Sequence, residues 1–127
     1  SNNDSTVFRL LYDGFTMLFC GDMEAQAERD LLEDGAALRA DVLKVAHHGS
    51  DTSTSAALLE AVQPRYAVIS SGEDRSMLPR NAVLQRLHTA GAEIFRTDTD
   101  GAVVFSAADG KISVITENGR SAACAEP

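Results

Sequence analysis

Short apolar runs that alternate with helix-forming segments constrain the fold of this chain more than any other feature of its sequence. The predicted strands cover residues 7–12, 15–20, 41–46, 66–70, 93–96, 102–105 and 111–116. The predicted helices cover residues 23–33, 56–62 and 79–90. Strands that alternate with helices in this way predict an α/β layer in the central part of the chain.

The first two predicted strands are separated by Asp13-Gly14, which suits the positive φ angles of a two-residue hairpin turn. They are therefore expected to pair antiparallel. A hairpin at this position does not belong to a simple doubly wound sheet, and no glycine-rich phosphate loop follows any predicted strand. The sequence thus lacks the fingerprint of a nucleotide-binding fold.

Length and hydropathy indicate one folded domain. The chain has 127 residues, of which 44% are hydrophobic, and no stretch approaches the ~20 apolar residues of a membrane span. The polar residues 1–5 do not resemble a signal peptide. We expect the domain to cover residues 1–116 and residues 117–127, which carry few large apolar side chains, to form a flexible tail.

The net charge and the cysteine content argue against several classes of function for this chain. A formal net charge of −8 argues against nucleic-acid binding through a basic patch. The two cysteines, Cys20 and Cys124, are too few for a disulfide scaffold and lack the spacing of a zinc site. We expect Cys20 to be a small buried hydrophobic residue.

Polar clusters follow three of the predicted strands directly. They are Gly21-Asp22, the His-His-Gly-Ser motif of residues 47–50, and residues 71–74. Strand ends are where functional groups converge in layered α/β folds. An aspartate and histidines at one edge would suit zinc, manganese or iron, and a metal-bound hydroxide is a natural nucleophile for hydrolysis.

Each cluster also has a purely structural interpretation. Asp22 stands where a helix N-cap belongs, and Ser50 lies in a Ser/Thr-rich loop that could cap the following helix. Adjacent residues of a strand point to opposite faces, so at most one of His47 and His48 can face a metal in the same way if the strand continues through both. We expect His88, on the third predicted helix, to serve packing or the surface.

The order and context of these residues resemble the second half of a metallo-β-lactamase-fold hydrolase. Residues 15–22, which end in Gly-Asp, and residues 40–50, which end in His-His-Gly-Ser, carry the resemblance. Supporting segments are residues 3–7, 59–64, 67–72 and 96–102. The chain is similar, over roughly residues 2–114, to the carboxy-terminal domain of ComEC-type DNA-internalisation competence proteins.

The resemblance implies an α/β fold that is half of a metallo-β-lactamase-type αββα sandwich, a mixed β-sheet with helices packed on one face. It implies that Asp22 bridges two metals, zinc or manganese, and that His47 and His48 are the histidine pair of the active site. Asn3 falls where many relatives have another metal ligand. Ser50 would donate a hydrogen bond to a phosphate. The implied activity is that of a phosphodiesterase or nuclease that degrades the DNA strand not taken up during transformation.

Two departures from the family pattern leave two hypotheses for the function of the chain. The cluster His-x-His-x-Asp-His of the first half does not occur in this chain, and Leu78 stands where relatives have the last metal-binding histidine. A leucine offers no lone pair, so at least one metal site is incomplete. The first hypothesis is a hydrolase domain that is inactive as this chain alone. The second is a degenerate, metal-free domain with a structural or protein-interaction role.

The partners that the resemblance implies follow from the missing half. We expect the N-terminal half of the same domain to cover an exposed apolar face of this chain, with a homodimer as the alternative. DNA is the expected substrate of the parent protein. That parent is expected to be embedded in a bacterial membrane, with this region as a soluble domain on its extracytoplasmic side.

Overall fold

A mixed five-stranded sheet lies at the centre of the computed structural model, which describes residues 8–12, 14–21, 25–33, 38–45, 54–70, 81–108, 111–119 and 121–124. Its strands are β1 (Phe8–Tyr12), β2 (Phe15–Phe19), β3 (Val42–Lys44), β4 (Tyr66–Ile69) and β5 (Glu93–Arg96). They are hydrogen-bonded in sequence order. The predicted strands therefore exist, with boundaries that differ by a few residues.

The sheet combines one antiparallel pair with a parallel array. β1 and β2 are antiparallel, with Tyr12 opposite Phe15, and Gly14 adopts a φ of 79° in the turn. The predicted hairpin is confirmed. Strands β2 to β5 are parallel to their neighbours, so their carboxyl ends lie at the same edge of the sheet.

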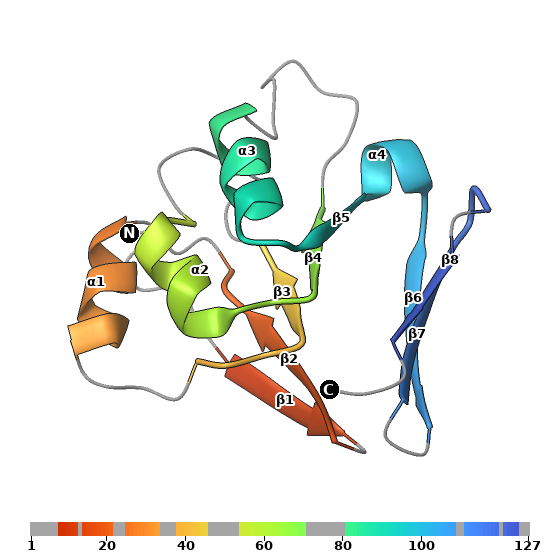
Figure 1. The fold of residues 1–127 in the computed structure, drawn as a ribbon, viewed down its shortest axis with the longest axis horizontal. Helices are drawn as coiled ribbons and strands as arrows, with labels where there is room; N and C mark the ends of the chain where they lie inside the picture. The colour runs from red at the N-terminus through yellow and green to blue at the C-terminus, as the bar shows by residue number, and fades with distance from the viewer. Residues whose placement is uncertain are drawn as a thin grey trace.

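The three longer helices cover one face of this sheet (Figure 1). They are α1 (Ala25–Glu33), α2 (Ala56–Val62) and α3 (Asn81–Thr89), and each connects two neighbouring parallel strands. Because the strands are added in one direction and such crossovers are right-handed, successive helices fall on the same face. The order does not reverse between β2 and β5, so this sheet has no topological switch point.

Apolar side chains from the helices and from the sheet form one core on this face. Leu18, Leu43, Ile69, Leu58 and Leu87 are all nearly inaccessible to solvent. On α1, Ala27, Leu31 and Leu32 recur at helical spacing and pack against this core. Burial of these side chains supplies most of the free energy that holds the helices on the sheet.

A second, antiparallel sheet covers the other face. It consists of β6 (Val103–Ala108), β7 (Lys111–Thr116) and β8 (Ser121–Cys124). The ring of Phe105 lies 6.1 Å from that of Phe15, 5.7 Å from that of Tyr66 and 6.3 Å from that of Phe95, centroid to centroid. Helices on one side of the central sheet and strands on the other are visible in Figure 1. The predicted mixed sheet with helices on one face is confirmed.

Two elements differ from the sequence prediction. β8 lies inside residues 117–127, which the sequence predicts to be a flexible tail, so that expectation is corrected for residues 121–124. β8 pairs with β7, with Cys124 opposite Ile112, and this pairing satisfies its backbone hydrogen-bonding groups. The small side chains of these residues give no strand signal in the sequence. The short helix α4 (Thr97–Asp100) was also not predicted. Among the described residues, no helix is long and apolar enough to cross a membrane.

Candidate functional site

The candidate site is the edge of the central sheet at which β2, β3 and β4 end. Phe19 is in register with Lys44, and Lys44 with Val68. Beyond β3, the N–H of Val45 still donates to the carbonyl of Val68 over 2.9 Å. The segments that carry Gly21-Asp22, the His-His-Gly-Ser motif and residues 71–74 therefore all start from neighbouring strand ends, as the sequence predicts.

The predicted site side chains themselves lie outside the described residues. This holds for the metal ligands Asp22, His47 and His48, for the phosphate donor Ser50, and for Leu78, so their roles stay predictions. Asn3 lies outside them as well. Within the described part of the chain, no three His, Cys, Asp or Glu side chains could hold a metal ion together. One carboxylate and two imidazoles form a donor set that zinc and manganese accept.

Cys20 directly follows β2 and lies in the core between the sheet and the helices. It is 1% exposed, and its thiol is free. Burial raises the pKa of Cys20 to about 12, and the nearby negative charge of Glu28 adds to this increase. The positive charge of Lys44 acts in the opposite direction. The thiol is therefore protonated at neutral pH and a poor nucleophile. The burial of Cys20 confirms the prediction of a small buried hydrophobic residue.

Glu28, in the first turn of α1, is the charged residue that the sequence did not single out. Its side chain is 1% exposed, and its carboxylate accepts hydrogen bonds from the backbone N–H groups of Thr54 and Ser55, the latter over 2.9 Å. Glu28 lies three and four residues before Leu31 and Leu32, on the apolar face of the helix. A carboxylate on that face is the signal that could have identified it.

Thr54 ends the segment that carries the His-His-Gly-Ser motif. Its φ is 60°, in the left-handed region that a β-branched residue rarely adopts. Its carbonyl accepts a hydrogen bond from Nε of Arg86 on α3 over 2.9 Å. The next residue, Ser55, caps α2 by accepting from the N–H of Leu58 over 3.2 Å, so the predicted Ser/Thr cap is confirmed. The start of α2 is thus held from both neighbouring helices.

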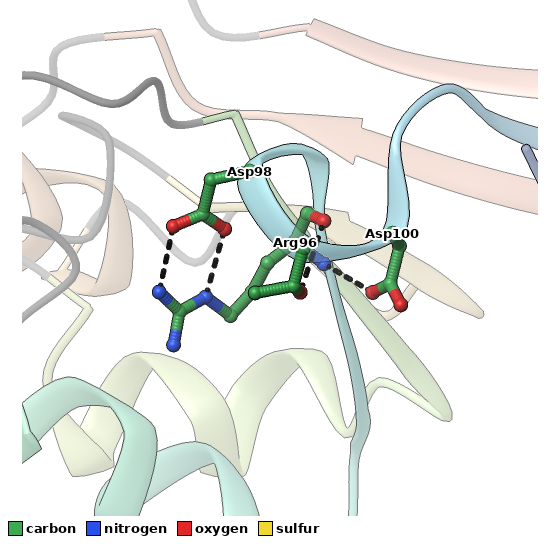
Figure 2. A network of polar contacts seen from close by, with 4 residues as sticks. Arg96, Asp98 and Asp100 are labelled. Atoms are coloured by element: carbon green, nitrogen blue, oxygen red, sulfur yellow. Dashed lines mark hydrogen bonds and ion pairs between the residues drawn. The ribbon is translucent and has the colours of Figure 1, made fainter. Parts of the chain in front are cut away.

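A polar turn follows β5 at the same edge of the sheet (Figure 2). The guanidinium of Arg96 donates to both carboxylate oxygens of Asp98, over 3.0 and 2.7 Å, and these hydrogen bonds raise the pKa of Arg96. The carboxylate of Asp100 accepts from the backbone N–H of Arg96 over 2.9 Å. The pairing stabilises the turn from β5 into α4. The sequence predicts that His88 serves packing or the surface, and the structure has it exposed on α3.

Comparison with known proteins agrees with this architecture. Residues 1–73 match the family model of the metallo-beta-lactamase superfamily. The chain is 38% identical over 113 residues to competence protein ComA of Neisseria gonorrhoeae, an alignment that covers 87% of the chain. It is 35% identical over 105 residues to ComE operon protein 3 of Bacillus subtilis, covering 82% of the chain. It is 37% identical over 105 residues to recombination protein 2 of Haemophilus influenzae, covering 81%.

These relatives are much longer than the matched region. The alignments cover 16%, 14% and 13% of the three relatives, in the same order. The similarity therefore concerns one part of each relative, and the name of the first relative refers to competence.

Proposed function

We propose, because the chain belongs to the metallo-β-lactamase superfamily, that it is the second half of a metal-dependent domain that hydrolyses phosphodiester bonds. The observation that carries the proposal is the parallel pairing of β2 and β3, since the segments with Asp22 and the His47-His48 pair follow these two neighbouring strands. Similarity to a competence protein supports DNA as the substrate of the whole protein.

The proposed roles follow the chemistry of the side chains. Asp22 would be the ligand shared by two metals, His47 or His48 would act as metal ligand or proton carrier, and Ser50 would donate a hydrogen bond to the phosphate. Zinc or manganese, when bound, supplies Lewis-acid activation of water and of the phosphate. Because Leu78 cannot act as a ligand, we expect one of the two metals to bind less tightly than in relatives that have a histidine there.

The proposed partner is the N-terminal half of the same domain. Apolar side chains that are exposed in this chain support a partner that covers them. Val104 and Ile115, directly opposite each other on the second sheet, are 54% and 56% exposed, and Leu11 on the edge strand β1 is 67% exposed. Without that half we expect no hydrolysis, and self-association of the chain is the alternative use of these surfaces. We place the domain, as part of the proposal, on the extracytoplasmic side of a bacterial membrane protein.

The test is to co-express the chain with the segment that precedes the matched region in the Neisseria gonorrhoeae relative. Elemental analysis and cleavage of single- and double-stranded DNA are then measured with zinc and with manganese. We expect metal-dependent cleavage that Asp22→Asn and His47→Ala each reduce by about 100-fold or more. His88→Ala, an exposed position on α3, is the control and should leave cleavage unchanged. A purified assembly without metal and without cleavage would overturn the proposal.

A second candidate function is a metal-free domain kept for structure or for contacts with other proteins. Leu78 in place of a histidine and the net charge of −8 favour it. This candidate predicts that the two halves assemble without metal and that Asp22→Asn changes neither the metal content nor the stability of the assembly.

A further inference from the structure

We propose that Glu28 is a positioning residue. Together with Arg86, it fixes the backbone of Thr54 and thereby sets where the His-His-Gly-Ser segment lies relative to the strand end that carries Asp22. The inference rests on the proposed function, because that function gives the His-His-Gly-Ser segment its role. The contacts of Glu28 and Arg86 with Thr54 are observed independently of that function.

The hydrogen bonds of Glu28 join the helix that follows Gly21-Asp22 in the chain to the two residues that precede α2. Glu28 belongs to the helix that follows Gly21-Asp22, and its carboxylate accepts from Thr54 and Ser55, directly after the His-His-Gly-Ser segment. A buried carboxylate that accepts two backbone N–H bonds holds the first turn of α1 against the residues that begin α2.

The conformation of Thr54 shows that its position is imposed by its surroundings. A positive φ in a β-branched residue costs free energy and persists only where neighbouring groups determine it. Glu28 holds the N–H of Thr54 from α1, and Arg86 holds its carbonyl from α3. At the other end of the segment, the N–H of Val45 is bound to Val68 of β4. Both described flanks of residues 46–53 are therefore fixed.

The hydrogen bonds to Thr54 are more than is needed to cap α2. Ser55 already caps α2 through its own side chain, so the start of that helix does not depend on Glu28 alone. The additional bonds act on Thr54, one residue earlier. A positioning role therefore predicts that loss of Glu28 changes the backbone at Thr54, whereas the Ser55 cap of α2 remains.

The experiment uses the isotopically labelled 127-residue chain and needs neither metal nor activity. Variants Glu28→Gln and Arg86→Lys are compared with Glu33→Gln, an exposed glutamate at the end of the same helix as Glu28. Amide hydrogen exchange and the imidazole resonances of His47 and His48 are recorded by NMR. We expect Glu28→Gln to speed exchange at Thr54 and Ser55 by ~10-fold and to move both imidazole resonances.

Exchange at the core amides of Leu43 and Ala67 should change by less than ~3-fold in the same variant. Arg86→Lys keeps one donor for the Thr54 carbonyl, so it should cause the same changes at smaller size. Should Glu28→Gln not fold, Arg86→Lys carries the test alone. Unmoved imidazole resonances, or a uniform rise in exchange at all amides, would overturn the proposal and leave Glu28 as a structural residue.

The assembled domain separates this inference from the proposed function. There, Glu28→Gln should lower kcat by ~10-fold with KM changed by less than ~2-fold, while Glu33→Gln has the parent activity. Equal activity of the two variants in a working assembly would contradict the positioning role. An assembly that is inactive without any substitution would contradict the proposed function, and the imidazole measurement on the chain would still decide the role of Glu28.

Discussion

The carboxylate of Asp41 accepts two hydrogen bonds from Thr16, one from its backbone N–H over 2.9 Å and one from its hydroxyl over 3.1 Å. The N–H of Asp41 in turn donates to the carbonyl of Thr16 over 3.0 Å. Both side chains are buried. These bonds join the start of β2 to the start of β3, at the edge of the sheet opposite the candidate site.

Replacing Asp41 should therefore lower stability without touching the candidate site. Asp41→Ala leaves a buried N–H and a buried hydroxyl without their acceptor, and we expect the free energy of unfolding to fall by about 2–4 kcal/mol. Asp30→Ala, on the exposed side of α1, should change it by no more than about 0.5 kcal/mol. Urea denaturation followed by circular dichroism measures both. Equal effects of the two substitutions would show that the Thr16 contacts contribute little.

Cys20 should be protected from thiol reagents and should make stability sensitive to alkaline pH. Its raised pKa, about 12 against 9.0 for a free thiol, means that the unfolded chain loses this proton at lower pH than the folded chain. The corresponding stability is fully present below pH 9 and is lost as the pH rises from 9 through about 12.

We measure this in a Cys124→Ser background, so that only Cys20 reacts. Labelling should be at least ~10-fold slower in buffer than in urea, because the reagent needs an exposed thiolate. Above pH 9.0, the free energy of unfolding should fall more steeply than in Cys20→Ala. Fast labelling of the folded chain would contradict the burial of this thiol.

The second sheet should depend on Phe105 for its attachment. Phe105 packs among the rings of Phe15, Tyr66 and Phe95, whereas its neighbour Val104 points to the opposite, exposed side of β6. We expect Phe105→Ala to cost about 3 kcal/mol and Val104→Ala no more than about 0.5 kcal/mol. Thermal and urea unfolding of the pair test this. A Val104→Ala cost as large as that of Phe105→Ala would contradict the assignment of the two faces.

Restoring a ligand at position 78 should strengthen metal binding in the assembled domain. Leu78 directly precedes Pro79 and stands where the family pattern has its last histidine. We expect Leu78→His to raise the metal content and the rate of phosphodiester cleavage together, because an imidazole completes the donor set. The chain alone should bind zinc and manganese weakly or not at all, which calorimetric titration checks. If the assembled variant gains neither metal nor activity, position 78 does not correspond to that histidine.

Local signals in the sequence determined the elements and the order in which they appear. The apolar periodicity of α1, the Asp13-Gly14 turn and the Ser55 cap all depend on residues within a few positions of one another, and the structure has each helix and the hairpin they predict. The strand within residues 117–127 has no such local signal. The residues of β8 are small and carry no periodic signal of their own, and only pairing with β7 makes them a strand.

Tertiary structure alone decided what the charged residues near the candidate site do. The sequence identified the strand ends with Asp22 and the His47-His48 pair, but parallel pairing of β2 with β3 was needed to make those ends neighbours. Glu28 and Thr54 are 26 residues apart, and nothing local connects them. Their contact exists because α1 and α2 pack side by side on one face of the sheet, where a buried carboxylate must find hydrogen-bond donors.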